Sequence, residues 1–473
     1  MRRMTWAAMG AAMTAGLVVV GALPAAAATD DLVLEEVAPD AVYSVVGPLL
    51  ELDGIIYFAG TSPAAPTGSW LFALDPATDT VGPVGATSDL GEVSGVASDG
   101  SRIFFLSPAG GEQAVHVYDP ASATTARYDW PSGEGAFPDR LAVVGDAVYV
   151  VLESDGLLYS VPTADPASAP GLAPTVTSPL PACADGTTAP TGVADGLRVA
   201  GGVLFYSQPC VDIGSDQLFR RADPSTAEAV AFPPPPAAAD LGGPYGALVQ
   251  GDRTLFAAGP IAGEQHLYSF LSADLSQPVV DLGGLNPGAP VSFQGAATWF
   301  MDDGGERRIF RSADGLTATA IGSTAGSDLE GELALVAWGD LLLLNGFPVI
   351  SPAEPVGTRT NYLFDPADQS LVRLGPQGAI VPPFAAADGS AYVTAFAAMG
   401  ADGDSQHLYR IVERHLPATG LDASSMALTA AVGALLVTLG LAGVLGSRRS
   451  LRRRRGDSNP RGLAPNTLSK RAP

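Results

Sequence analysis

The sequence predicts an all-β fold: a β-propeller of eight four-stranded blades, with seven as the alternative, followed by a single C-terminal transmembrane helix. Three observations support this prediction. A glycine turn followed by an aromatic or β-branched strand recurs through residues 29–415 at spacings of 44 to 56 residues. Gly (56) and Pro (40) accompany 47% hydrophobic residues, which suits many short strands and turns. Residues 425–446 form one uncharged apolar run.

The repeat has a constant order of parts. Each unit fits one strand ahead of the glycine turn, two strands after it, and a fourth strand such as the one beginning at Thr80, with Asp-Pro often closing the third. The turn glycines are Gly54, Gly100, Gly145, Gly201, Gly251, Gly295, Gly339 and Gly389. A period of roughly 40 to 50 residues is typical of propeller blades, and ring closure removes exposed sheet edges. We expect Pro162–Thr191 and Pro233–Pro236 to be loops between blades.

The charge distribution limits the possible partners. Residues 29–415 contain 14 Arg, no Lys and 47 acidic residues. Such an acidic body repels nucleic acid, so we predict no nucleic-acid partner. The only lysine is Lys470, in the tail. A lysine-linked pilus backbone subunit needs a lysine amine in its exported part, so the sequence excludes this role.

The N-terminus predicts secretion. Arg2 and Arg3 precede an apolar run from Ala11 to Leu23, and Ala26–Ala28 offers the small side chains that signal peptidase accepts. Residues 1–28 are therefore predicted to be a signal peptide, and residues 29–415 the exported propeller. The alternative, a first transmembrane helix, is disfavoured because the apolar run is short.

The C-terminus predicts a membrane span with the tail inside. As a helix, residues 425–446 extend roughly 33 Å, enough for a bilayer core. The basic segment 447–473 follows at once, and the positive-inside rule assigns it to the cytoplasm.

Leu416, Pro417, Ala418, Thr419 and Gly420 stand just ahead of that span. This arrangement resembles the Leu-Pro-x-Thr-Gly sorting signal of sortase-anchored surface proteins of Gram-positive bacteria. The resemblance implies that a sortase cysteine attacks the Thr419 carbonyl, that Gly420 leaves, and that peptidoglycan becomes the covalent partner. The implied product is a secreted protein anchored to the cell wall, with the membrane as a partner only during sorting.

The repeat also resembles that of bacterial extracellular propellers with an Asp-Gly-Thr motif. The nearest stretch is Arg308-Ile-Phe-Arg-Ser-Ala-Asp-Gly-Leu-Thr, whose end is also loosely similar to the Asp-box of sialidase propellers. The resemblance implies the fold and supplies no activity.

Cys183 and Cys210 are the only two cysteines, and in an exported chain such a pair predicts a disulfide. A metal site or a thiol catalyst is the less favoured reading.

Histidines and paired acids are the candidate metal ligands. His116, His266 and His407 recur at one position of the repeat, which indicates blade architecture rather than three ligands converging on a metal. Asp302-Asp303-Gly304 and Asp402-Gly403-Asp404 suit Ca²⁺ loops but lack the EF-hand spacing, so solvated turn acids are preferred. No cofactor and no metal site are predicted.

Two classes of function remain open. The favoured one is a non-catalytic binding or structural head that holds a glycan or protein ligand. The alternative is a hydrolase or lyase that acts on polysaccharide or wall through carboxylate catalysis. No nucleophile elbow, His-Glu-x-x-His motif or P-loop is present, so no catalytic residue is predicted.

Overall fold

The computed structural model describes residues 32–39, 41–62, 69–84, 93–109, 112–128, 136–152, 158–164, 175–176, 195–210, 215–223, 226–229, 242–259, 265–325, 329–348, 359–379, 381–396 and 406–413. The chain divides into two compact units, Met1–Glu413 and Arg414–Pro473, and all of these residues lie in the first. Within the described ranges, no helix has the length and apolarity needed to cross a membrane.

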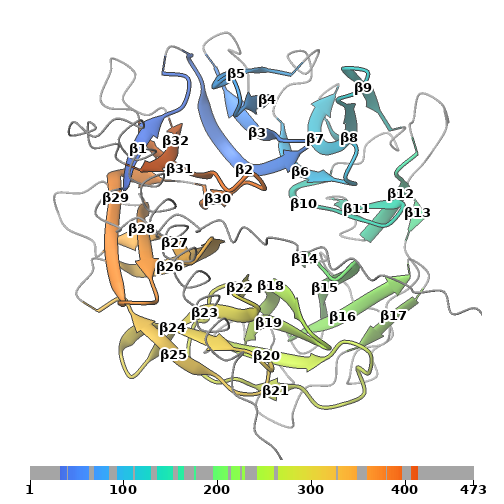
Figure 1. Cartoon of the computed structure of the whole chain (residues 1–473). Helices are drawn as coiled ribbons and strands as arrows, with labels where there is room; N and C mark the ends of the chain where they lie inside the picture. The colour runs from blue at the N-terminus through green and yellow to red at the C-terminus, as the bar shows by residue number, and fades with distance from the viewer. Residues whose placement is uncertain are drawn as a thin grey trace, which may run out of the picture. The chain divides into compact units, whose positions relative to one another are not determined.

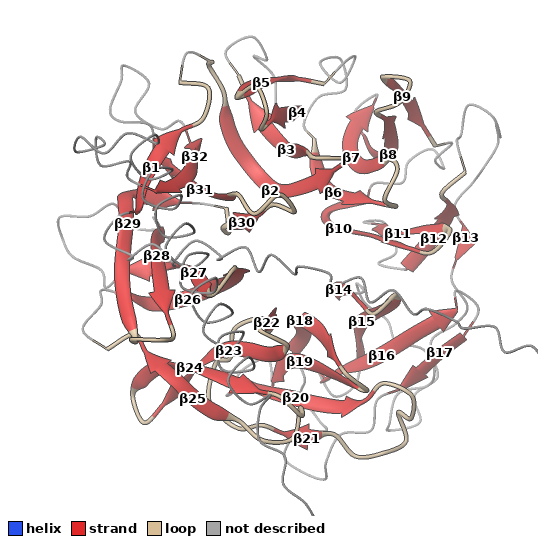
Figure 2. Cartoon of the chain, in the orientation of Figure 1, coloured by secondary structure: helices blue, strands red, loops and turns tan. Residues whose placement is uncertain are grey.

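The described residues form 32 strands in eight four-stranded antiparallel sheets, here called blades 1 to 8 (Figures 1 and 2). Blades 1 to 4 comprise β2 (Ser44–Leu52), β3 (Ile55–Thr61), β4 (Trp70–Asp75), β5 (Thr80–Pro83); β6 (Ser94–Ser98), β7 (Ile103–Ala109), β8 (Glu112–Asp119), β9 (Thr124–Arg127); β10 (Ala136–Val144), β11 (Ala147–Leu152), β12 (Leu158–Pro162), β13 (Thr175–Val176); and β14 (Asp195–Ala200), β15 (Val203–Cys210), β16 (Ser215–Asp223), β17 (Thr226–Ala229).

Blades 5 to 8 continue the pattern, except that the last blade takes its outer strand from the start of the chain. They comprise β18 (Gly242–Gln250), β19 (Arg253–Gly259), β20 (His266–Leu271), β21 (Val280–Asp281); β22 (Val291–Phe293), β23 (Ala296–Asp303), β24 (Glu306–Ser312), β25 (Thr319–Ser323); β26 (Leu329–Trp338), β27 (Leu341–Pro348), β28 (Arg359–Asp365), β29 (Ser370–Ala379); and β30 (Phe384–Ala385), β31 (Ala391–Phe396), β32 (Gln406–Glu413), β1 (Leu32–Glu36).

The predicted repeat of four-stranded units is confirmed, and its eight turn glycines fall one in each blade. All eight have a positive φ, between 57° and 89°, and lie where the first strand of a blade turns into the second. A side chain is strained in this conformation, whereas glycine adopts it freely. The recurring glycine is therefore required by the backbone of each hairpin.

Alternating side chains pack each blade against both neighbours. On β3, Ile56 and Phe58 join a cluster shared with blade 8, whereas Tyr57 and Ala59 join one shared with blade 2. Successive side chains of a strand point to opposite faces, so strands buried on both faces become apolar at consecutive positions.

The ring is closed, because a hydrophobic cluster fills every junction between neighbouring blades. Eight such clusters are present among the described residues, one for each consecutive pair and one between blades 8 and 1. An open row of eight sheets would have only seven junctions. The predicted propeller architecture is thus confirmed, with eight blades in the described part of the chain.

Blade 8 joins the first and last strands that the structure describes. β1 pairs antiparallel with β32 from Leu32↔Glu413 to Glu36↔Tyr409 (Figure 1). The His407 ring stacks on Tyr43 with centroids 4.8 Å apart, and its Nδ1 lies 2.5 Å from a carboxylate oxygen of Glu36. Strands from opposite ends of the chain therefore hold the ring together.

Polar bonds between turns reinforce the junctions. Gln250 donates to the carbonyl of Gly295 in the next blade at 2.6 Å, and the Trp338 indole donates to the carbonyl of Gly389 at 2.7 Å. Both donors lie at the end of a first strand, and both acceptors are turn glycines. The turns thus contribute contacts between blades as well as reversing the chain.

One predicted loop contains a strand. Thr175–Val176, inside the stretch Pro162–Thr191 that we expected to be loop, pairs with Tyr159 and Ser160 as the outer strand of blade 3. That expectation was wrong at these two residues, because backbone pairing to β12 completes the blade although the proline-rich sequence shows no strand pattern, and at Pro162, which ends β12 and pairs with Ala147. Pro233–Pro236, Leu416–Gly420, and residues 1–28, 425–446 and 447–473 lie outside the described residues.

Candidate ligand-binding site

A cavity of about 710 Å³, here called the arginine cavity, lies against blades 4 to 8. Its lining includes Arg198 from the first strand of blade 4, and Arg307 and Arg359 from the beginnings of the third strands of blades 6 and 7. The other described residues of the lining are Gly246, Gln265, Asn286, Pro287, Gly288, Ala289, Phe300, Ala334 and Pro382. Arg307 and Arg359 thus occupy similar positions in their blades, whereas Arg198 lies in the second half of β14.

A tight hairpin sets the position of Arg307. Gly304 and Gly305, at φ 64° and 90°, turn β23 into β24 and place Asp302 directly opposite Arg307. The Arg307 Nε donates to Asp302 Oδ1 at 3.1 Å, with the two side chains 14% and 28% exposed. The guanidinium also lies over the Phe300 ring, 5.3 Å from its centroid.

This arrangement leaves part of the guanidinium unsatisfied. The Nη1 atom of Arg307 is buried and has no hydrogen-bond partner among the described residues. A buried cationic donor without a partner is unfavourable by roughly 1–3 kcal/mol or more. Arg307 is therefore held in place on one side, by Asp302 and Phe300, and lacks a partner on the other.

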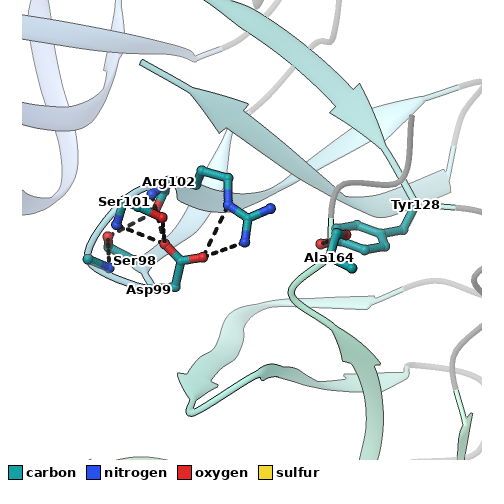
Figure 3. Close-up of polar contacts among 7 residues, drawn as sticks. Ser98, Asp99, Ser101, Arg102, Tyr128 and Ala164 are labelled. Carbon is teal, nitrogen blue, oxygen red and sulfur yellow. Dashed lines mark hydrogen bonds and ion pairs between the residues drawn. The ribbon is translucent and has the colours of Figure 1, made fainter. Parts of the chain in front are cut away.

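Arg102 of blade 2 also lies near an aromatic ring and a carboxylate, but here the carboxylate bonds two nitrogens of the guanidinium (Figure 3). Its guanidinium lies 5.5 Å from the Phe104 ring, while Nε and Nη2 both reach Asp99 Oδ2, at 3.2 and 2.7 Å. Burial opposes ionisation of Asp99, but hydrogen bonds from Ser101 and Arg102 outweigh it and hold its pKa below the ordinary value. This carboxylate also binds the backbone of its own turn, so the Arg102 ion pair has a structural role.

The loop of residues 285–289 forms the wall of the arginine cavity beside Phe300, and hydrogen bonds hold it against β23. The Leu285 and Asp302 backbones exchange two hydrogen bonds, of 3.2 and 2.8 Å, and the Gly288 N–H donates to the Phe300 carbonyl at 2.9 Å. The Asn286 side chain, on a backbone at φ 50°, donates to Asp302 Oδ2 at 3.2 Å. The loop is thus tied to β23 along its length, which gives the cavity a defined wall.

Close packing requires glycine in this loop. A Cβ atom at Gly288 would lie 2.0 Å from Phe300 Cε1, far inside van der Waals contact. The Arg307 guanidinium lies over the same ring. Any side chain at position 288 would therefore displace the ring on which Arg307 rests.

The three predicted histidines occupy the third strands of their blades, as the repeat indicated, but their surroundings differ. His116 is 2% exposed and stacks on Phe105, and burial, assisted by the charge of Arg127, lowers its pKa to about 4. His266 pairs with Asp281 at 2.8 Å, and His407 pairs with Glu36. No group of three or more metal-ligating side chains occurs within the described ranges.

The two acidic turns have separate outcomes. Asp302 and Asp303 lie in the hairpin between β23 and β24 and form ion pairs with Arg307 and Arg308. Their carboxylates are thus engaged by cations of the same hairpin. Asp402-Gly403-Asp404 lies outside the described residues.

The stretch similar to an Asp-box is a compact turn in blade 6. Asp314 accepts hydrogen bonds from the backbone N–H groups of Leu316 and Thr317, at 2.9 and 3.0 Å, and these lower its pKa to about 2. Ser312 accepts the Gly315 N–H at 2.9 Å. The motif therefore stabilises a local turn.

The predicted disulfide and the predicted sortase motif are not tested by the structure. Cys183 lies outside the described residues, so its bond to Cys210 in β15 is untested. Leu416, Pro417, Ala418, Thr419 and Gly420 also lie outside them.

The sequence pattern did not reveal the arginine cavity. Its lining comes from five blades, and Arg198 and Arg359 are 161 residues apart in the chain. Only an indirect indication of a basic site was present in the sequence. Residues 29–415 contain just 14 Arg, so few residues could form one.

Comparisons with known proteins assign this chain to no family. No family model and no curated protein matches the chain. Among solved structures, a prolyl endopeptidase is 13% identical with a TM-score of 0.44, covering 79% of this chain and 55% of the other. The chain thus spans about half the length of the first structures it matches.

Two other solved structures have similar scores. An oligogalacturonate lyase in complex with manganese is 13% identical with a TM-score of 0.40, covering 68% of this chain and 88% of the other. A GH74 enzyme from Niastella koreensis is 13% identical with a TM-score of 0.39, covering 76% and 70%. Likenesses of this size assign no activity to this chain. The fold and the cavity define its class, a β-propeller with a basic pocket.

Proposed function

We propose that this protein is a surface protein joined to the cell wall through Thr419, and that its propeller binds an extracellular ligand in the arginine cavity without transforming it. The cavity is the observation that supports binding. Its volume lies within the roughly 300–1,000 Å³ usual for small-ligand sites. Its wall is clamped to β23, so the site is largely formed before a ligand arrives.

Binding is favoured over carboxylate catalysis by the composition of the lining. The described lining residues comprise arginines, amides, glycines and apolar side chains, with no Asp or Glu. Hydrolysis of a glycosidic bond by the usual mechanism needs two acids beside the bond. The arginine cavity offers charge and hydrogen-bond donors, which suit recognition.

Binding and turnover are tested together. The purified chain would be applied to an array of glycans and proteins, and each retained ligand then incubated with it and examined by mass spectrometry. The proposal predicts retention of a ligand that is recovered intact, and loss of that retention in Arg359→Gln. Cleavage of the ligand would instead support the hydrolase or lyase alternative.

Anchoring is supported by the Leu416–Gly420 motif, the apolar run 425–446 and the basic tail 447–473. β32 ends at Glu413, which leaves two residues between the last strand and Leu416.

The anchor is tested by digesting purified walls with a muramidase and analysing the released protein by mass spectrometry. We expect a C-terminal peptide that ends at Thr419 and carries a wall fragment. Recovery of the protein from membranes with its arginine tail intact, in cells with an active sortase, would refute the anchor.

A further inference from the structure

The arginine cavity has the opposite charge to the rest of the exported region. Residues 29–415 carry 47 acidic residues against 14 Arg, yet three of these arginines line one cavity. Bringing like charges together is unfavourable unless something compensates. Asp302 compensates one side of Arg307 from outside the lining, and the lining residues that the structure describes include no carboxylate.

Arg307 is the most informative of the three. Its side chain is 14% exposed, so it is shielded from bulk water but borders the cavity, and its Nη1 has no partner among the residues that the structure describes. Asp302 and the Phe300 ring already fix the plane of the guanidinium. A fixed guanidinium fork matches the two oxygens of a carboxylate or phosphate group, and little side-chain entropy is lost when they bind.

We infer that the arginine cavity binds a saccharide that carries a carboxylate or phosphate group, with Arg307 as the principal oxyanion contact and Arg359 as the second. This inference rests on the proposed function and names the chemical class of its ligand. Gln265 and Asn286 add amide groups to the lining, and amides pair with sugar hydroxyls. The oxyanion would pair with the Arg307 guanidinium, and the cavity is large enough for sugar units around it.

The same hairpin offers a matched control. Arg308 follows Arg307 on β24, so its side chain points to the other face of the blade. It is 40% exposed, pairs with Asp303 and Glu306 at 3.2 Å each, and does not line the cavity. Arg307→Gln and Arg308→Gln remove the same charge from adjacent positions, so long-range electrostatic effects are nearly equal.

The experiment measures binding by isothermal titration calorimetry with the full chain in a non-ionic detergent. The probes are a uronic-acid trisaccharide, the methyl ester of that trisaccharide, and a glycerol phosphate oligomer carrying sugar. We expect Arg307→Gln and Arg359→Gln each to weaken binding of a charged probe at least 10-fold, and Arg308→Gln to change it less than 2-fold. The first two probes differ in the charge of the carboxyl groups and in the methyl groups of the ester, and the third distinguishes phosphate from carboxylate.

The outcomes separate the inference from the proposed function. If the methyl ester binds as well as the acid and is still lost in Arg307→Gln, the cavity is the site but the ligand class is wrong. If charged probes bind and all three variants behave alike, both proposals fail. Failure of every probe to bind overturns the inference, while the array of glycans and proteins still tests the proposed function. Thermal melting of each variant shows whether it folds, and Arg359→Gln supplies a second test from another blade should Arg307→Gln unfold.

Discussion

Replacing Phe58 with alanine tests whether the junction between blades 8 and 1 holds the ring closed. Phe58 is fully buried in the cluster that joins the two blades. Its ring stacks on Phe72 with centroids 5.7 Å apart and lies 6.0 Å from Tyr43. A buried Phe→Ala substitution costs about 3–5 kcal/mol, of which aromatic pairing accounts for about 0.5–1.5 kcal/mol.

Urea unfolding followed by tryptophan fluorescence measures this loss. We expect Phe58→Ala to lower the free energy of unfolding by about 3–5 kcal/mol, because the cavity it leaves lies between two packed sheets. Val46→Ala is the control, since Val46 is 46% exposed on β2 of the same blade and should change stability by about 0.5 kcal/mol or less. A loss below about 1 kcal/mol in Phe58→Ala would refute the closed junction.

Three further predictions concern other parts of the chain. Because burial lowers the pKa of His116 from 6.5 to about 4, the unfolded state binds its proton more readily between these pH values, so the stability contribution present above pH 6.5 is lost as the pH falls towards 4. His116→Gln should remove up to about 3 kcal/mol of this acid sensitivity, measured as the difference in unfolding free energy between pH 7 and pH 4; an unchanged difference would contradict the burial. Gly288→Ala should lower the melting temperature and weaken ligand binding, because its Cβ would lie 2.0 Å from Phe300; a variant equal to wild type in both would show that the loop does not pack there. A Cys183–Cys210 disulfide should appear as one cross-linked peptide by mass spectrometry without reductant, and reduction should cost about 3–4 kcal/mol of stability; two free thiols would exclude the bond.

The sequence predicted the parts of the fold that are local and repeated. Every turn glycine adopts a positive φ, a backbone requirement that leaves a mark in the sequence at each repeat. The pairing of β1 with β32 left no such mark, because it joins strands nearly 380 residues apart and depends on ring closure. Thr175–Val176 was also missed, since two residues in a proline-rich stretch carry no strand periodicity.

The candidate site could not be predicted from the sequence for a similar reason. Among the described strands, only β24 and β28 have an arginine at or next to the start of a third strand, and only the folded ring shows that Arg307 and Arg359 border the same cavity as Arg198. By contrast, the repeated histidines attracted attention in the sequence, yet each has its own local role. A residue that recurs at one position of the repeat indicates the architecture of the blades. The proposed ligand site depends on residues that do not recur.

The most direct test of ligand binding is a crystal structure of the protein in complex with the uronic-acid trisaccharide. The account predicts a carboxylate within about 3.2 Å of the guanidinium groups of Arg307 and Arg359, with the Arg307–Asp302 pair retained. A trisaccharide bound on another face of the propeller, with the arginine cavity free of it, would contradict the account.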